Sequence, residues 1–283
     1  MTLITDGGST KCDWVLLDDL GKVLFKTTTR GLNPAVLPKI ELSDRINEND
    51  TLRSIFNKVE KLDFYGAGCG TPTPTSILED VLQSLFLNAQ ITVREDTAAA
   101  VFSVTTEPGI VCILGTGSNS CYFDGLNIQT PIPALGYILM DESSGNHYGR
   151  KLIRDYYYKK MPAHIAAEFS KQFNLDADEI KANLYKKPNP NVYLASFAQF
   201  MFSSEIAKET YFHDIIKEGI SEFISSRILT FENAREVPIH FIGSIAHCSS
   251  EIIETCLKEN NLKFGNIVKR PIDGLIEYYR RKI

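Results

Sequence analysis

One glycine hairpin occurs twice in this chain, and the repeat constrains the fold more than any other feature of the sequence. The first copy, residues 3–14, reads LITDGGSTKCDW, and the second, residues 112–123, reads CILGTGSNSCYF. Aligning the copies places Gly8 opposite Gly117. Each copy predicts an apolar strand, a tight turn that needs the backbone freedom of glycine, and a returning strand. We therefore expect two similar turns that face each other across a cleft.

The length of the chain indicates two domains. A chain of 283 residues exceeds the size at which one hydrophobic core usually stops growing, so two domains of roughly 100–170 residues each are expected. Glu107-Pro108-Gly109 interrupts the pattern of strands and helices, and we place the boundary there. The predicted domains are residues 1–107 and residues 108–283. A helical insert is expected at about 146–236, and the final helix could pack back on the first domain.

Charge and cysteine content narrow the classes of partner. The formal net charge is −5 and the pI is about 5.6, which gives no general attraction to nucleic acid or to an anionic membrane. No window is long and apolar enough to span a bilayer, so a cytoplasmic protein without nucleic-acid or membrane partners is expected. The six cysteines are scattered without any Cys-x-x-Cys pair, and we interpret them as reduced structural thiols.

The order of predicted elements is that of an α/β protein. The first three strands predict an antiparallel meander, and later strands alternate with helices, which is typical of an α/β layered domain. Strands are expected near residues 10–17, 22–29, 63–66, 90–94 and 237–242, and on both sides of the turn in each glycine hairpin, within residues 3–14 and 110–123. Helices are expected within residues 43–61, 74–87, 97–102, 152–173, 192–205, 211–229, 249–260 and 273–281.

Asp6 is the first candidate for chemistry, because it ends a strand directly before Gly7, Gly8, Ser9, Thr10 and Lys11. A carboxylate there could hold Mg2+, directly or through water, while the turn donates hydrogen bonds to phosphate. An Asp-Gly turn without any ligand explains the same residues. The second glycine turn favours the phosphate interpretation.

That second turn, Gly115-Thr116-Gly117-Ser118-Asn119, lacks a carboxylate. A third transition from a strand to glycine occurs at Gly243-Ser244. The three together suggest two domains that close on one nucleotide. Neither the Walker pattern nor Gly-x-Gly-x-x-Gly occurs, so these glycines encode a different kind of site.

Asp96 follows the strand at 90–94 and precedes an alanine-rich helix. Open α/β sheets bind ligands at the carboxyl ends of their strands, where this carboxylate could accept the proton of an attacking hydroxyl. A helix N-cap is the competing interpretation.

Further polar residues could contact a sugar. Asp141 and Glu142 lie in a loop bounded by Gly136 and Gly145, and could bind sugar hydroxyls or simply be solvated. Asn33, between glycine and proline neighbours, could contact a polyol or stabilise a turn.

Taken as a set, these motifs resemble the N-acetylglucosamine kinase branch of the BadF/BadG/BcrA/BcrD ATPase family, within the actin, sugar-kinase and Hsp70 superfamily. The resemblance extends from residue 3 to about residue 250. The motifs that carry it are Asp6-Gly7-Gly8-Ser9-Thr10-Lys11, Gly31-Leu32-Asn33-Pro34, Gly66-Ala67-Gly68-Cys69, Asp96-Thr97-Ala98-Ala99, Leu114-Gly115-Thr116-Gly117-Ser118-Asn119 and Gly136-Tyr137 with Asp141-Glu142.

The resemblance implies two ribonuclease-H-like (actin-like ATPase) domains facing a central cleft, with a helical insert in the second and with ATP and Mg2+ as cofactors. It makes Asp6 the metal residue and Asp96 the base that takes a proton from the 6-hydroxyl of the sugar. The implied nucleotide residues are Gly7, Gly8, Ser9, Thr10, Lys11, Gly115, Thr116, Gly117, Ser118, Gly243 and Ser244. The implied sugar residues are Asn33, Gly68, Asn119, Gly136, Asp141 and Glu142.

We therefore predict an ATP-dependent kinase of an amino sugar, with N-acetylglucosamine as the first candidate. ATP and the amino sugar are the expected partners, and a homodimer is left open. One alternative is an ATPase that activates a dehydratase, although its iron–sulfur cluster needs closely placed thiolates and the closest cysteines here are Cys248 and Cys256. The other is a sensor that binds sugar or nucleotide without turnover.

Overall fold

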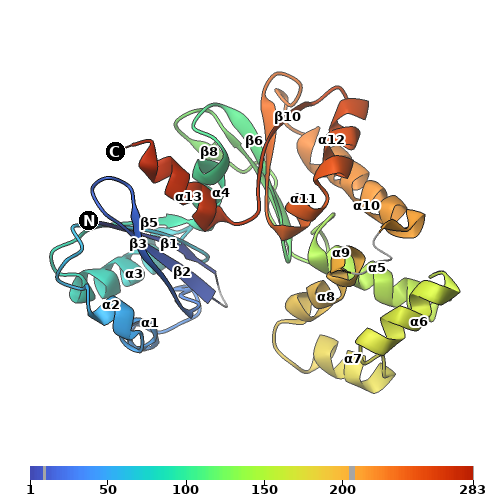
Figure 1. Ribbon diagram of the computed structural model, residues 1–283, viewed down its shortest axis with the longest axis horizontal. Helices are drawn as coiled ribbons and strands as arrows, with labels where there is room; N and C mark the ends of the chain where they lie inside the picture. The colour runs from blue at the N-terminus through green and yellow to red at the C-terminus, as the bar shows by residue number, and fades with distance from the viewer. Residues whose placement is uncertain (9–10, 204–207, 283) are drawn as a thin grey trace. The chain divides into compact units, whose positions relative to one another are not determined.

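The computed structural model describes residues 1–8, 11–203 and 208–282. The chain forms two compact units (Figure 1): unit 1 comprises Met1–Thr106 and Arg270–Ile283, and unit 2 comprises Glu107–Lys269. Within the described ranges, no helix combines the length and the apolar character that crossing a bilayer requires.

Unit 1 is built on a five-stranded mixed sheet with the order β3-β2-β1-β4-β5. Its first three strands form the predicted antiparallel meander, and β4 and β5 pair parallel to β1. The strands are β1 (Thr2–Gly7), β2 (Lys11–Leu17), β3 (Val23–Arg30), β4 (Lys61–Gly66) and β5 (Gln90–Glu95). The helices are α1 (Lys39–Asn47), α2 (Asp50–Arg53), α3 (Pro72–Leu85), α4 (Asp96–Val104) and α13 (Pro271–Arg280).

The core of unit 1 lies between the sheet and α1, α2 and α3, while α4 and α13 cover the opposite face (Figure 1). Trp14, the single tryptophan of the chain, is fully buried in this core and stacks with Phe86 at a ring-centroid distance of 6.4 Å. Its indole N–H donates a 3.0 Å hydrogen bond to Thr29 Oγ1. A buried tryptophan usually needs such a partner for its N–H group.

Unit 2 repeats the same arrangement, with a five-stranded sheet in the order β10-β9-β6-β7-β8. Here β7 pairs antiparallel with β6 and β8 antiparallel with β7, while β9 pairs parallel with β6 and β10 parallel with β9. The strands are β6 (Gly109–Leu114), β7 (Ser118–Phe123), β8 (Ile128–Gln129), β9 (Pro238–Ile242) and β10 (Lys263–Val268). Both units therefore have the ribonuclease-H-like topology that the sequence predicted.

The two glycine hairpins are equivalent in the structure, but their alignment differs from the sequence prediction. Gly7 ends β1 where Leu114 ends β6, and β2 starts at Lys11 where β7 starts at Ser118. Gly7 pairs with Cys12 and Leu114 pairs with Ser118, so the first turn has one residue more than the second. Matching glycine to glycine missed this because strand pairing, rather than residue identity, sets the register.

The helical insert lies between β8 and β9, where unit 1 carries only α1 and α2 between β3 and β4. Its elements are α5 (Gly145–Tyr157), α6 (Ala163–Gln172), α7 (Ala177–Tyr185), α8 (Pro190–Ala198), α9 (Phe200–Ser203), α10 (Thr210–Phe223) and a π-helical turn (Ile224–Ile228). Two further helices, α11 (Ser244–Cys248) and α12 (Ser250–Glu259), follow β9. The single helix expected within 152–173 is two helices, because Pro162 stands at the N-cap of α6.

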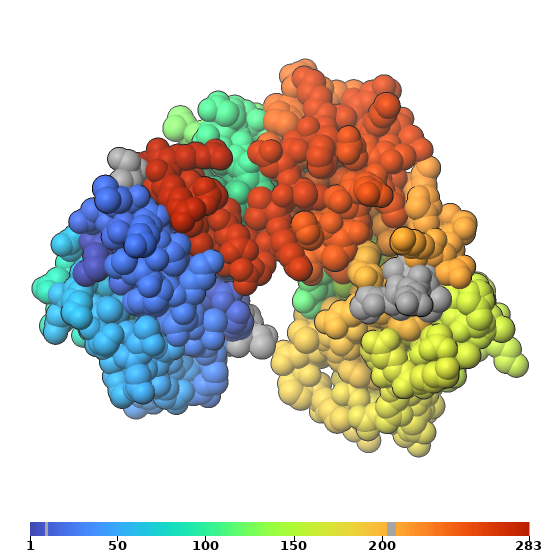
Figure 2. Space-filling view, in the orientation of Figure 1, coloured from blue at the N-terminus to red at the C-terminus, as the bar shows by residue number. Residues whose placement is uncertain are grey.

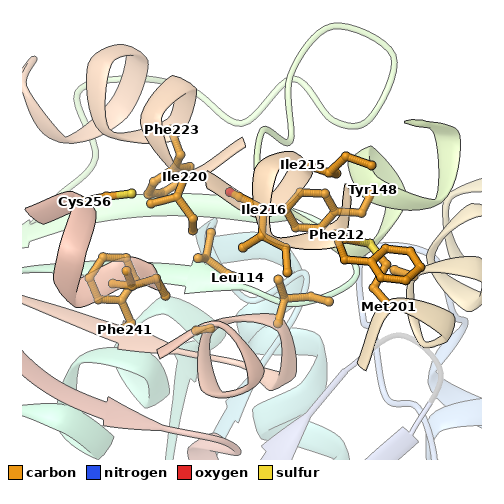
Figure 3. Close-up of a cluster of buried hydrophobic side chains, with 14 of the residues drawn as sticks. Leu114, Tyr148, Met201, Phe212, Ile215, Ile216, Ile220, Phe223, Phe241 and Cys256 are labelled. Carbon is orange, nitrogen blue, oxygen red and sulfur yellow. The ribbon is translucent and has the colours of Figure 1, made fainter. Parts of the chain in front are cut away.

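Figure 3 shows the hydrophobic contacts between the helical insert and the sheet of unit 2. Tyr148 of α5 lies among Phe212 and Ile216 of α10, and its hydroxyl donates a 3.3 Å hydrogen bond to the Ile216 carbonyl. Leu114 of β6 and Phe241 of β9 belong to the same hydrophobic cluster. The insert is thus part of one continuous apolar core with the sheet.

The final helix is part of unit 1, in agreement with the expectation that it could pack back on the first domain, and unit 2 therefore ends at Lys269 rather than at residue 283. Helix α13 packs on α4 and β1, and Arg280 donates a 3.0 Å hydrogen bond to the Gly21 carbonyl of the β2–β3 turn. In Figure 2 the red C-terminal segment lies directly on the blue N-terminal segment. The physical reason for the assignment is burial, because Leu275 and Tyr279 of α13 are covered in this packing.

A buried polar network anchors α13. The hydroxyl of Tyr279 donates a 2.6 Å hydrogen bond to Asp63 Oδ2 and lies 2.8 Å from the hydroxyl of Tyr65. Lys61 Nζ completes the network 3.1 Å from Asp63 Oδ2. Burial raises the pKa of Tyr279, so its hydroxyl remains a donor to the carboxylate over the whole working range of pH.

We predict that Tyr279→Phe lowers the free energy of unfolding of unit 1 by about 1–3 kcal/mol, because it removes a donor from the buried Asp63 carboxylate. Urea unfolding followed by Trp14 fluorescence measures this directly, since the only tryptophan lies in unit 1.

Tyr278→Phe is the matched control. Its ring stacks on Phe102 at 4.9 Å and would be retained, so we expect a change below about 0.5 kcal/mol. Equal destabilisation by the two variants would show that the hydroxyl of Tyr279 does not anchor the helix.

Candidate active site

The first group of candidate residues lies at one edge of the unit 1 sheet. Because β1, β4 and β5 are mutually parallel, their carboxyl ends meet at the same edge. Asp6 lies near the end of β1, Gly68 follows β4, and Asp96 follows β5 directly. The sheet thus brings together both carboxylates that the sequence singled out.

Asp6 is half-buried, and its environment disfavours the negative charge. Burial raises the pKa of Asp6 to about 7, with further contributions from the neighbouring carboxylates of Asp13 and Asp96. Lys11 and Arg270 act in the opposite direction, but more weakly. A carboxylate in this situation gains from a cation, since a positive charge nearby would stabilise its ionised form.

The first glycine turn is held by backbone contacts. The Gly8 N–H donates a 2.8 Å hydrogen bond to the Lys11 carbonyl, and Lys11 Nζ lies 2.7 Å from Asp13 Oδ1. A Cβ atom at Gly7 would lie 2.6 Å from the ring of Phe64, so only glycine fits there. Ser9 and Thr10, which the resemblance assigns to the nucleotide, lie outside the described residues.

Asp96 is the first residue of α4, and Glu95 occupies the N-cap position. The Asp96 carboxylate accepts hydrogen bonds from its own backbone N–H and from that of Thr97. Burial raises the pKa of Asp96, the charge of Glu95 raises it further, and the two backbone hydrogen bonds oppose the shift. The interpretation of Asp96 as the N-cap is therefore wrong, because Glu95 has that position, although the Asp96 carboxylate contacts the first helical turn.

Asn33 and Gly68 lie in direct contact in unit 1. A Cβ atom at Gly68 would lie 2.0 Å from Asn33 Oδ1, and the backbone of Gly68 has a φ of +80°. Asn33 Oδ1 also accepts the Ala35 N–H at 3.0 Å, so the turn interpretation of Asn33 holds locally. The charge of Asp96 contributes to raising the pKa of Cys69, the residue after Gly68, which shows that this loop lies near the Asp96 carboxylate.

The second group of residues surrounds a cavity of about 440 Å³ in unit 2. The cavity opens between the β6–β7 turn, α8 and α11. Its lining residues are Gly115, Thr116, Gly145, Val192, Ala195, Ser196, Gln199, Phe202, Ser244, Ile245 and Cys248. It brings together the second glycine turn and the Gly243-Ser244 transition, which are far apart in the sequence.

Backbone hydrogen bonds tie the second glycine turn to the start of α5. The Gly145 N–H donates to the Gly115 carbonyl at 2.8 Å, and the Asn146 N–H donates to the Thr116 carbonyl at 3.0 Å. A Cβ atom at Gly115 would meet nothing within 4 Å, so this glycine faces open space. The hydroxyl of Ser118 is buried and has no hydrogen-bond partner within the described part of the chain.

Gly243 is required by geometry. Its φ is +120°, and a Cβ atom there would lie 2.1 Å from the Leu114 carbonyl oxygen. Because the two backbones approach this closely, α11 begins at Ser244 directly beside the end of β6. Ser244 lines the cavity at this position.

Asp141 supports the second glycine turn from outside the cavity. Its Oδ1 accepts the Ser118 N–H at 3.1 Å, and its Oδ2 accepts Asn146 Nδ2 at 2.8 Å. The backbone of Asp141 has a φ of +73°, an uncommon conformation for a residue other than glycine. A buried carboxylate held in this way fixes where the turn sits.

The remaining sugar candidates of unit 2 lie apart from this cavity. Glu142 lines a different cavity, described below. Asn119 Oδ1 accepts the Ser120 N–H at 2.9 Å, and Gly136 has a φ of +79° in the loop before Asp141. The cavity residues that the sequence prediction missed are the three of α8, together with Gly145, Gln199, Phe202, Ile245 and Cys248. The spacing of Val192, Ala195 and Ser196 marks one helix face, but nothing in the sequence shows what that face lines.

The residues present fit ATP and Mg2+. The open side of Gly115 and the unpartnered hydroxyl of Ser118 are features that a phosphate group would complete. Mg2+ is commonly held by one or two carboxylates together with phosphate oxygens, and Asp6 is a carboxylate whose charge Lys11 and Arg270 offset only in part.

Two ribonuclease-H-like units in one chain define the actin-like ATPase fold, which sugar kinases share. The chain belongs to the BadF/BadG/BcrA/BcrD ATPase family, which matches residues 5–276. Among solved structures, it is similar to a protein of Porphyromonas gingivalis provisionally assigned as an N-acetylglucosamine kinase. The two chains share 34% identity over 99% of each, with a TM-score of 0.90.

Two more distant structures share the fold. A protein of Chromobacterium violaceum with the same provisional assignment is 13% identical over 98% of each chain, with a TM-score of 0.74. A glucokinase from Streptomyces griseus, in complex with glucose and AMPPNP, is 14% identical over 98% of this chain and 97% of its own, with a TM-score of 0.56. A search of curated proteins found no match.

We predict that Asp6→Asn stabilises the ligand-free protein by about 2–4 kcal/mol at pH 8 and by much less at pH 4. Asp6 has a pKa of about 7 in the folded chain and the ordinary aspartate pKa of 3.8 in the unfolded chain. The free energy of unfolding of the parent therefore falls as the pH rises between these two values. Asparagine carries no charge and avoids this loss. Urea unfolding at several pH values measures the difference, and a difference that does not grow with pH would contradict it.

We also predict that MgATP protects Cys248 from thiol reagents. Cys248 is exposed in the unit 2 cavity, whereas the other five cysteines are buried. Ellman's reagent should therefore modify one thiol rapidly, and saturating MgATP should slow that reaction about tenfold or more. Cys248→Ser should lack the rapid phase, and magnesium chloride alone serves as the control. An unchanged rate with MgATP would show that the nucleotide binds elsewhere.

Proposed function

We propose that this protein is an ATP-dependent sugar kinase that transfers the γ-phosphoryl group to the 6-hydroxyl of N-acetylglucosamine or a related amino sugar. The observation that carries the proposal is the placement of Asp6 and Asp96 at one sheet edge of unit 1. The cavity lined by Gly115 and Ser244 in unit 2 supplies a separate place for the nucleotide. The similarity to the Porphyromonas gingivalis protein, at 34% identity, supports an amino sugar as the acceptor.

In this mechanism, unit 2 binds the nucleotide. The adenosine moiety occupies the cavity against the face formed by Ala195 and Ser196 of α8. Phosphate oxygens accept hydrogen bonds from the second glycine turn, which Asp141 and the start of α5 hold in position. Because this turn is held by hydrogen bonds before any ligand arrives, little reorganisation is needed on binding.

In unit 1, Asp96 acts on the acceptor hydroxyl. Its raised pKa makes it a stronger proton acceptor than an exposed aspartate. As the sugar oxygen forms its bond to the γ-phosphorus, the hydroxyl proton passes to the Asp96 carboxylate, and the bond from that phosphorus to the ADP oxygen breaks. Asn33 and Gly68 contact the sugar from the neighbouring loop. Asp6 would hold Mg2+, which would supply positive charge to the phosphates.

This mechanism requires the bound sugar and the γ-phosphate to come together in the ternary complex. Water must not take the place of the sugar beside the γ-phosphate. In sugar kinases, the protein closes when both substrates bind, and this closure excludes water. The proposal therefore predicts slow ATP hydrolysis in the absence of sugar.

A coupled assay of ADP release over a panel of hexoses, N-acetylhexosamines and muramic-acid derivatives tests the proposal. We expect N-acetylglucosamine or a close relative to give the highest kcat/KM, and phosphorylation at the 6-hydroxyl can be verified by NMR of the product. ADP release that no sugar stimulates would contradict a kinase and favour the alternative of a sensor.

We predict that Asp96→Asn lowers kcat about 100-fold to 10,000-fold, because the amide cannot accept the hydroxyl proton. Glu95→Gln is the matched control, since it neutralises the adjacent carboxylate and leaves Asp96 in place. A change below about tenfold is expected for the control. Turnover by Asp96→Asn at the parental rate would remove Asp96 from the mechanism.

A further inference from the structure

Unit 2 contains a second cavity, of about 400 Å³, that the proposed reaction does not use. It lies between α5, the loop before α5, and α10, and shares no lining residue with the cavity at Gly115. Its lining residues are Leu139, Met140, Glu142, His147, Arg150, Lys151, Arg154, Asp155, Tyr158, Lys160, Ile215, Glu218 and Glu222. The volume is within the range of small-molecule sites.

One wall of this cavity is basic. Arg150 and Arg154 lie one turn apart on α5, so their like charges share one face of the helix. Arg150 Nη1 donates a 3.2 Å hydrogen bond to the Tyr137 carbonyl, and the Arg154 guanidinium lies 6.0 Å from the centre of the Tyr158 ring. These contacts orient both guanidinium groups, and neither group forms an ion pair with a carboxylate in the part of the chain that the structure describes.

The opposite wall is acidic. Glu218 and Glu222 lie one turn apart on α10, and Glu142 lies on the loop. Among the described residues, no ion pair joins these three carboxylates to Arg150, Arg154 or Lys160, although all line one cavity. Lys151 differs, because it lies 3.3 Å from the buried carboxylate of Asp155.

Each wall therefore carries a pair of like charges on consecutive helical turns, and such pairs destabilise a helix unless a counter-charge is present. No ion pair joins the two walls among the described residues. His147 adds no charge near neutral pH, because burial and the neighbouring Arg150 and Lys151 lower its pKa to about 4. A ligand with a negative group at one end and a positive group at the other would neutralise both walls at once.

We propose that this cavity is a binding site for a small zwitterion, with a phosphate or carboxylate against Arg150 and Arg154 and an ammonium group against Glu218 and Glu222. Amino sugars with a free amine and an acidic substituent have this chemistry. Phosphate and carboxylate satisfy the basic wall equally well in principle, and the experiment below distinguishes them.

Helix α5 connects this cavity to the one at Gly115. Its first residue, Gly145, lines the Gly115 cavity and is bonded to the glycine turn, while Arg150 and Arg154 farther along line the zwitterion site. Glu142 also adjoins Asp141, which holds the Ser118 N–H. We expect a zwitterion to change nucleotide affinity, and the nucleotide to change zwitterion affinity by the same factor. This consequence rests on the proposed function, whereas binding of the zwitterion does not.

Isothermal titration calorimetry of the full chain tests the site, with saturating N-acetylglucosamine present to occupy the sugar site. The zwitterionic probes are glucosamine 6-phosphate and muramic acid, which differ in the acidic group. Glucose 6-phosphate and glucosamine each lack one of the two charges. We expect at least one zwitterion to bind about tenfold or more tightly than both single-charge probes. Failure of both zwitterions, or equal binding of a single-charge probe, would overturn the proposal.

Variants locate the binding. Arg154→Gln and Glu222→Gln should each weaken the binding of the zwitterion about tenfold or more, while basal kinase activity stays unchanged. Lys181→Gln, on the exposed surface of α7, is the control and should leave binding unchanged. Binding that resists both substitutions would place the zwitterion elsewhere and overturn the proposal.

Titration of ADP with and without the zwitterion then tests the connection through α5. A change in ADP affinity of about fivefold or more is expected. No change would remove the coupling, while tight zwitterion binding that is sensitive to Arg154 would still support the site.

Discussion

Parallel pairing of one strand with the central strand of each sheet is the constraint on which the candidate site depends. In unit 1, β4 pairs parallel to β1, and in unit 2, β9 pairs parallel to β6. A parallel neighbour must end at the same edge as the strand it pairs with. Asp6 is thereby placed with Asp96, and the turn after β6 is placed with Gly243, although long stretches of chain separate the members of each pair.

At the sheet edge of each unit, several features are unfavourable for the folded chain and favourable for a ligand. The pKa of Asp6 is raised to about 7, the hydroxyl of Ser118 is buried without a partner in the described chain, and Asp141 has a φ of +73°. Strained or unsatisfied groups persist only where the surrounding structure holds them. Here the backbone hydrogen bonds from Gly145 and Asn146 provide that support. Asp6 in unit 1 is suited to a metal ion, and the second glycine turn in unit 2 is suited to a phosphate group.

The sequence predicted the local elements of the site well. Both glycine hairpins are present, and Asp96 follows a strand and starts a helix, as its alanine-rich context indicated. The predicted alignment of the two hairpins differs from the observed one because the first turn has one residue more than the second, and glycine identity does not report strand register. Strand β10 was missed because Lys263–Val268 mixes polar and apolar residues without a clear alternation.

The chain by itself determined the types of its elements, the positions of its glycine turns and the carboxylates at its strand ends, since these depend on local backbone preference and periodicity. Only the tertiary structure decided that α13 belongs with unit 1, that Asp141 supports the second turn, and that one face of α8 lines a cavity. Such facts arise from contacts between residues far apart in the sequence. No local pattern carries the geometry of a distant partner, and so burial and pairing in the folded chain had to supply it.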